Sequence, residues 1–192
     1  MSVHETSSKC QQTVAELILS RRTIHAFQAE PPAREIVLRA ADLARWAPNH
    51  LLTEPWHFYL LGPETADAIA CLNAELVTRG KGPQAGQAKL DRWRAVPGWL
   101  VVTCDNSEDP VRAREDYAAC CCAIHNFSLY LWSEGIGVKW TTGEVIRDPS
   151  FYDLIWVNPE LETVVALLWY GYPAEVPQTT RKSLSQVLVE LP

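Results

Sequence analysis

Apolar residues at helical spacing predict two helices at the start of the chain. The first stripe begins at Val14 and leads into Arg21-Arg22, where we expect the helix to end. A proline pair at 31–32 opens the second helix, and Pro48 ends it. The polar residues 1–12 have no such pattern, and we expect them to form a flexible leader.

The remaining chain predicts an alternation of strands and helices. We expect strands at 56–61, 99–104, 138–142 and 163–170, and helices at 64–79, 87–95, 112–134 and 150–156. The helix at 112–134 is the longest, is followed by Gly135 at its C-terminus, and is apolar on nearly all sides. It therefore belongs at the centre of a fold or of a dimer. The glycines between 80 and 86 indicate a mobile loop and a candidate lid.

The order of these elements favours an α+β fold. It lacks the regular strand–helix alternation of a doubly wound sheet, and no G-x-G-x-x-G motif follows a strand. A chain of 192 residues buries one substantial core, so we expect a single domain over 1–192. Residues 173–192 are expected to form an extended C-terminal arm.

The composition of the chain limits which binding partners and which cellular location we expect for the protein. The net charge of -6 has no basic tract behind it, which makes nucleic acid a poor partner. No stretch has the apolar length of a membrane span and no signal peptide is evident, so we expect a cytoplasmic protein. Six cysteines include the consecutive Cys120, Cys121 and Cys122, which predict reduced thiols and favour small core residues over a redox function.

Two segments carry basic groups suited to an anion. Arg21-Arg22-Thr23 offers two guanidinium groups and a hydroxyl, donors that suit a phosphate. His25 is close enough in sequence to share the site. A solvated helix end with surface arginines remains the simpler alternative, and Arg181 on the neutral tail has the same ambiguity.

Two further segments place polar groups beside predicted strands. His50 and Glu54 lie in the loop before the strand at 56–61, where ligands are often held, although His50 equally fits a surface histidine. His57, inside the strand, is interpreted as structural. Trp140-Thr141-Thr142 suits hydrogen bonding to a planar heterocycle or an ordinary turn. Most tryptophans, Trp46, Trp56, Trp132 and Trp169 among them, are expected to fill the core.

Other chemistries lack their motifs. The chain contains no G-x-S-x-G elbow, no P-loop and no H-E-x-x-H motif, and its cysteines and histidines lack the spacing of zinc ligands. Glu115 and Asp116 are interpreted as ion-pairing residues at a helix start rather than a catalytic pair.

Taken in order, these segments resemble the nitroreductase family of flavoproteins, in particular its short, single-domain bacterial branch. The similarity spans roughly residues 14–190. It is carried by Arg21-Arg22-Thr23, Phe27, Ala44-Arg45-Trp46-Ala47-Pro48, Pro55-Trp56-His57-Phe58, Gly135-Ile136-Gly137-Val138-Lys139-Trp140, Gly143, Gly171-Tyr172-Pro173 and Arg181-Lys182.

The resemblance implies a central, mostly antiparallel sheet flanked by helices, and a homodimer interlocked through the long helix and the terminal arms. It also implies one FMN in each of two interface sites. The phosphate and ribityl chain would be held by Arg21, Arg22 and Thr23, with Arg181 closing on the phosphate. The flavin would be approached by His50, Glu54, Trp140, Thr141 and Thr142.

The activity implied is hydride transfer from NAD(P)H through the flavin to a small electron-poor substrate such as a nitroaromatic, quinone or enone. The chemistry takes place at the flavin, so no catalytic side chain is expected. Two alternatives stay open: a flavin-dependent oxidase or dehydrogenase of a specialised metabolite, and a non-catalytic flavin-binding redox sensor. This sequence departs from the branch at Glu54, usually glutamine, at Leu51 and Leu52, often polar, and at Thr141, often arginine.

Overall fold

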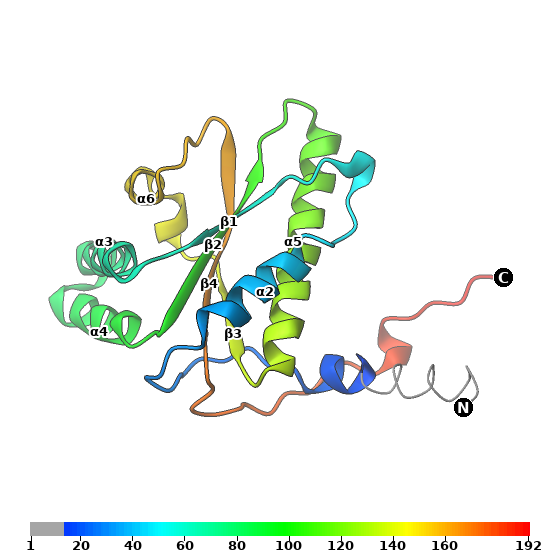
Figure 1. Cartoon of the computed structure of the whole chain (residues 1–192), viewed down its shortest axis with the longest axis horizontal. Helices are drawn as coiled ribbons and strands as arrows, with labels where there is room; N and C mark the ends of the chain where they lie inside the picture. The colour runs from blue at the N-terminus through cyan, green and yellow to red at the C-terminus, as the bar shows by residue number, and fades with distance from the viewer. Residues whose placement is uncertain (1–13) are drawn as a thin grey trace.

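An antiparallel sheet forms the centre of the fold (Figure 1). In the computed structural model, which describes residues 14–192, four strands pair in the order β1-β2-β4-β3. All neighbouring strands are antiparallel. Their bounds are Trp56–Leu60 for β1, Gly98–Asp105 for β2, Gly137–Thr141 for β3 and Glu162–Gly171 for β4. The α+β prediction is confirmed, and the leader expected over 1–12 lies outside the described residues.

Helices cover the two faces of this sheet (Figure 1). One face packs against α2 (Arg34–Ala44) and α5 (Pro110–Ser133). The other packs against α3 (Pro63–Lys81), α4 (Pro83–Arg94) and α6 (Pro149–Ile155). Residues 14–20 are also helical, and short 3-10 turns occur at His50–Leu52, Glu144–Arg147 and Leu184–Gln186. Among the described residues, no helix is both long and apolar enough to cross a membrane.

The long helix α5 is fixed at both ends by local chemistry. Pro110 occupies its first turn, and the Asp109 side chain accepts a hydrogen bond of 2.9 Å from the backbone N–H of Val111. Gly135, with φ of +75°, follows its last turn in the left-handed conformation. Within this chain α5 buries one side, whereas Tyr117 and Val111 remain exposed.

The expectation of a mobile lid at residues 80–86 is wrong. Helix α3 continues to Lys81, and Gly82 alone, with φ of +84°, separates it from α4. Gly86 is buried inside α4, where an added Cβ would lie 1.9 Å from Thr78 Oγ1 of α3. These glycines therefore allow a tight helical hairpin, in which two helices approach too closely for a larger side chain.

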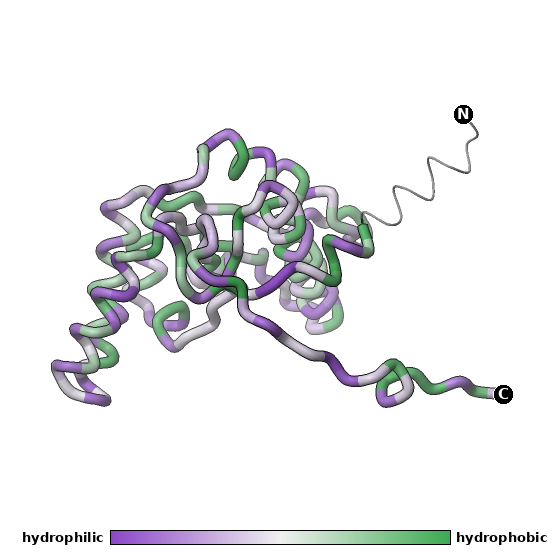
Figure 2. Tube along the Cα trace, turned by 90° about the horizontal axis from the view of Figure 1, so that it is seen from below, coloured by the Kyte–Doolittle hydropathy of each residue, from purple (hydrophilic) through white to green (hydrophobic). Residues whose placement is uncertain are grey.

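The segment after the first helix is held against the sheet edge. Thr23 forms a parallel bridge with Val138 of β3, and the Ile24 N–H donates to the Val138 carbonyl at 3.2 Å. Further along, the Gln28 N–H donates to the Tyr172 carbonyl at 2.9 Å. Residues 23–28 thus lie between β3 and the start of the C-terminal tail. The tail then runs away from the body, with hydrophobic residues toward its end (Figure 2).

Five of the eight tryptophans are buried or half-buried, as expected, whereas Trp46, Trp140 and Trp156 are exposed. Trp93, Trp99 and Trp169 form a cluster with ring centroids 4.9 to 5.7 Å apart. Trp56 is also buried. The prediction for Trp46 is wrong: its side chain is 73% exposed, because it follows the end of α2 and packs only under the Arg45 guanidinium.

Candidate functional site

A small cavity of about 160 Å³ lies between α5, β3 and the segment that follows the first helix. Three of the residues singled out in the sequence line it, namely Arg21, Thr23 and Trp140. Its other walls come from α5 and β3 and consist of Ile124, His125, Ser128 and Val138. The fold therefore brings together segments that are more than one hundred residues apart in the chain.

The alternation of β3 explains which side chains reach this cavity. Val138 and Trp140 lie two residues apart and share the sheet face that packs against α5. The bridge between Thr23 and Val138 fixes the basic segment beside them. On α5, Ser128 Oγ donates to the Ile124 carbonyl at 2.7 Å. Hydroxyl, imidazole and indole groups thus accompany Arg21 at one cavity.

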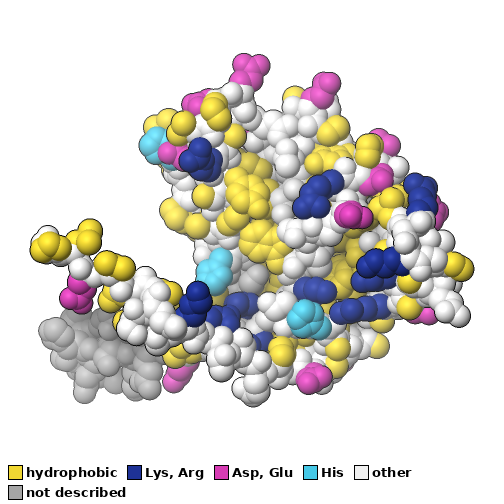
Figure 3. All heavy atoms as spheres, turned by 180° about the vertical axis from the view of Figure 1, so that it is seen from behind, with side chains coloured by type: hydrophobic (Ala, Val, Ile, Leu, Met, Phe, Trp, Pro, Cys, Tyr) yellow, Lys and Arg dark blue, Asp and Glu magenta, His cyan; other side chains and the backbone are white. Residues whose placement is uncertain are grey.

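The cavity adjoins a cluster of arginines. Burial, together with repulsion from Arg181 and Arg22, lowers the pKa of Arg21 from its ordinary value. In the described part of the chain none of these three arginines forms an ion pair with a carboxylate. Figure 3 shows basic side chains gathered where the C-terminal arm meets the body. Arg22 donates to the Leu19 carbonyl at 2.6 Å and Arg181 to Thr179 Oγ1 at 2.8 Å, so neither is bound to a carboxylate in the described residues. Neighbouring guanidinium groups of this kind fit a multiply charged anion such as a phosphate.

His50 and Glu54 lie elsewhere within this chain. Both are exposed on the loop between α2 and β1, and the Glu54 N–H donates to Asn49 Oδ1 at 3.0 Å. Thr53 in the same loop donates to Asp116 at 2.6 Å, which holds the loop beside the first half of α5. The cavity, in contrast, is lined by the second half of that helix.

His25, Thr141 and Thr142 do not line the cavity. His25 is exposed and follows the buried Ile24. Thr141 belongs to the opposite face of β3 from Trp140, and its Oγ1 is buried with no hydrogen-bond partner in the described residues. Thr142 is exposed just beyond the end of the strand.

Sequence reasoning missed His125 and Ser128. They lie three residues apart on α5 and so project from neighbouring positions of one helical face. That spacing of two polar residues was the available signal. It was overlooked because the helix was interpreted as apolar on nearly all sides.

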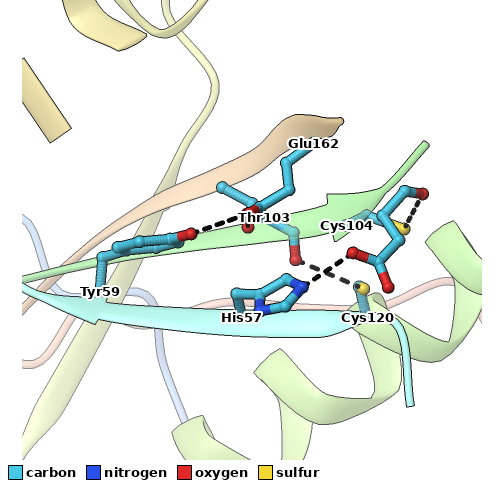
Figure 4. A network of polar contacts seen from close by, with 7 residues as sticks. His57, Tyr59, Thr103, Cys104, Cys120 and Glu162 are labelled. Atoms are coloured by element: carbon cyan, nitrogen blue, oxygen red, sulfur yellow. Dashed lines mark hydrogen bonds and ion pairs between the residues drawn. The ribbon is translucent and has the colours of Figure 1, made fainter. Parts of the chain in front are cut away.

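A second polar network lies on the sheet, away from this cavity (Figure 4). Tyr59 donates to the Glu162 carboxylate at 2.8 and 3.0 Å, and Thr103 donates to the same carboxylate. His57 Nε2 and Asp105 Oδ1 are 2.8 Å apart. These bonds join β1, β2 and β4, so they hold neighbouring strands in register.

The predicted role of Asp116 is confirmed. Its carboxylate lies 3.5 Å from the Arg112 guanidinium one turn earlier on α5, in addition to the bond from Thr53. Asp116 is therefore an ion-pairing residue of the helix start, as its position in the sequence indicated.

Comparison with known proteins gives one consistent result. The model of the nitroreductase family matches residues 18–172. A Bacillus subtilis protein named as a candidate NAD(P)H nitroreductase, YfhC, is 30% identical over 172 residues, covering 88% of each chain. A nitroreductase-like protein from Bacillus cereus is 27% identical with a TM-score of 0.82, covering 93% of this chain and 95% of that one.

A further structure shares the fold at lower identity. A candidate nitroreductase from Desulfovibrio desulfuricans, solved in complex with FMN, is 21% identical with a TM-score of 0.75 and covers 93% of this chain and 96% of its own. The family model spans most of the chain, and the relatives are covered over nearly their whole length. The chain therefore belongs to the nitroreductase family.

Proposed function

We propose that this protein is an FMN-dependent oxidoreductase that passes electrons from NAD(P)H to a small electron-poor substrate such as a nitroaromatic, quinone or enone. The observation that carries the proposal is the cluster of Arg21, Arg22 and Arg181 beside the cavity, without a counter-ion among the described residues. Membership of the nitroreductase family supports it, as does the FMN bound by the Desulfovibrio protein.

The basic cluster fits the phosphate end of FMN. Guanidinium groups donate paired, charge-assisted hydrogen bonds that match phosphate oxygens. Arg21 and Arg22 come from the segment held at the edge of β3, whereas Arg181 comes from the tail. Thr23 adds a hydroxyl at the cavity, suited to the ribityl chain. A tail residue in this cluster would close over the phosphate after binding.

The flavin, when bound, supplies hydride chemistry at N5, and the protein orients it and excludes water. Trp140 is the large apolar side chain at the cavity and is 38% exposed, which leaves its ring free to pack against a planar ligand. His125 and Ser128 offer polar atoms on the opposite wall. This arrangement requires no nucleophilic or acid–base side chain.

We further propose that the site is completed by a second copy of the chain. The loop with His50 and Glu54 contacts α5 near Asp116, about 12 to 18 Å along the helix from the residues that line the cavity. Leu51 and Leu52 of this loop are 79% and 81% exposed. A two-fold axis relating two α5 helices would bring the partner's loop toward the cavity and bury these leucines.

An anaerobic reduction and reoxidation experiment tests the proposed activity. Purified protein reconstituted with FMN is mixed with NADPH or NADH, and the visible flavin bands are followed before a nitroaromatic or a quinone is added. We expect the bands to bleach and then to return. Bands that persist with both reductants would contradict the reductase and favour the oxidase or sensor alternatives.

A further inference from the structure

Two buried polar atoms on one face of the sheet lack a hydrogen bond. Trp169 is 2% exposed, and its Nε1 has no partner in the described part of the chain. Thr141 Oγ1 on the adjacent strand β3 is likewise buried and unpaired. Both residues face α3 and α4, the side opposite the cavity at Arg21. Buried polar groups of this kind are normally hydrogen-bonded, so this face of the sheet is unusual in its polar chemistry.

Lys139 brings a positive charge to the same place. It pairs directly with Trp169 in the sheet register, and its Nζ lies 4.6 Å from the centroid of the indole ring. It is two residues before Thr141 and therefore shares its face of β3. The ammonium group has no carboxylate partner among residues 14–192.

Helix α4 adds two more cations. Trp93 of α4 packs edge-on against Trp169 at 4.9 Å, which places the end of this helix beside Lys139. Arg92 is next to Trp93, and Lys89 lies one turn earlier on the same face as Arg92. Burial and repulsion from Arg92 and Lys89 lower the pKa of Lys139. The nearby Asp91 carboxylate accepts a hydrogen bond from Gln87 at 2.8 Å.

This concentration of positive charge is not a consequence of composition. The chain has 17 basic against 23 acidic residues and a net charge of -6. Neither Arg92 nor Lys89 forms an ion pair in the part of the chain that the structure describes. A local cluster of unpaired cations on an acidic protein attracts anions and raises their local concentration.

We propose that Lys139, Arg92 and Lys89 form a second anion-binding site, which holds a phosphate or carboxylate of a molecule that exchanges electrons at the flavin. The inference rests on the proposed function. Lys139 and Trp140 are neighbours on β3 and point to opposite faces, so the second site is separated from the first by a single strand. The 2′-phosphate of NADPH and the carboxylate of an aromatic acceptor share the required chemistry.

Equilibrium binding tests the site independently of turnover. FMN-loaded protein is titrated with 2′,5′-ADP and with benzoate and followed by calorimetry, for the wild type, Lys139→Gln and Arg92→Gln. We expect each substitution to lower the affinity for one of the two ligands about tenfold, because a charge-assisted contact is lost. Lys139→Arg should retain the affinity. Lys81→Gln, which makes the same charge change at the exposed end of α3, is the control.

Steady-state kinetics then identifies the source of the anion. In Lys139→Gln, a rise of about tenfold in KM for NADPH but not for NADH assigns the site to the reductant. The same rise for 4-nitrobenzoate but not for the neutral 4-nitrobenzyl alcohol assigns it to the acceptor. In either case kcat and the FMN-to-protein ratio should match those of Lys81→Gln.

Two results would overturn the inference. One is unchanged binding of both 2′,5′-ADP and benzoate in Lys139→Gln and Arg92→Gln. The other is loss of FMN in Lys139→Gln, which would place this lysine in the flavin site itself. A wild-type protein that NADPH and NADH fail to reduce would remove the proposed function, while the titrations would still decide whether the anion site exists.

Discussion

Among single residues that differ from the family pattern, Glu54 has the clearest expected effect on the reduction potential of the flavin. An ionised carboxylate facing the flavin disfavours the negative charge of the reduced ring, whereas glutamine does not. Glu54→Gln should therefore raise the reduction potential, on the order of 30 mV for about 1.4 kcal/mol in a two-electron couple. A redox titration beside the exposed control Glu64→Gln checks this. An unchanged potential would place Glu54 away from the ring.

Tyr59 gives the molecule a specific response to alkaline pH. Burial and the Glu162 carboxylate raise the pKa of Tyr59 to about 12, from the ordinary value of 10.0. Folding therefore favours the protonated phenol, and its contribution to stability is complete below pH 10 and lost between pH 10 and about 12.

Tyr59→Phe should accordingly flatten the fall in unfolding free energy over that range of pH. Burial also raises the pKa of Tyr170 to about 12, so part of the slope should remain in the variant. Urea unfolding at several pH values from about 8 to about 12 measures the difference. An identical slope in the wild type and the variant would show that Tyr59 titrates normally.

The sequence allowed site residues to be predicted where their side-chain chemistry differs from that of the neighbouring positions in the chain. Arg21, Thr23 and Trp140 were found because basic groups at a helix end and hydroxyls after a strand suit a phosphorylated heterocycle, and the fold places all three at one cavity. His125 and Lys139 were not found. Their roles depend on which face of a helix or strand meets a distant segment, and that pairing is a long-range property.

At the scale of elements, the packing of Gly137 fixes the basic segment against β3. An added Cβ at Gly137 would lie 2.2 Å from Ile24 Cγ1, so the segment would have to move. Gly137→Ala should cost about 1–3 kcal/mol of stability and weaken FMN binding. Gly80→Ala in α3, where nothing lies within 4 Å, is the matched control. Equal flavin affinity in the two variants would show that the position of this segment does not affect FMN binding.

Element boundaries were readable where proline or glycine marks them. Helix α5 begins at Pro110 and ends two residues before Gly135, so the structure confirms the predicted helix within a few residues. The lid prediction is wrong because Gly82 forms the turn between α3 and α4, and Gly86 allows the close contact between these two helices. Strand order was not readable, since β2 pairs with β1 and β4 across long intervening segments.

At the scale of the whole molecule, the C-terminal arm exposes apolar side chains that a second chain could bury. Its end carries exposed apolar side chains at Leu184, Val187, Leu188, Val189 and Leu191. Removing residues 184–192 keeps Arg181 and should weaken the proposed homodimer, because this surface would lose its burial. Sedimentation over a range of concentrations measures the change. A truncated protein that stays as dimeric as the full chain would exclude the arm from the interface.

The proposed dimer would account for a difference between the sequence prediction and the single-chain structure. His50 and Glu54 were grouped with Arg21 by the family resemblance, yet within one chain they lie beside different halves of α5. Assembly is encoded in surface shape, which no local sequence pattern reports. The family resemblance predicts sites at an interface between two chains, whereas the local patterns of the sequence do not.

We propose that Arg21, Arg22 and Arg181 bind the phosphate of FMN. The most direct measurement compares the affinities of FMN and riboflavin, which differ only in that phosphate, for the wild type and for Arg21→Ala. We expect the wild type to prefer FMN strongly, and Arg21→Ala to lose about 1.5–3 kcal/mol of FMN binding while riboflavin binding stays the same. Equal affinities for the two flavins in the wild type would contradict the account.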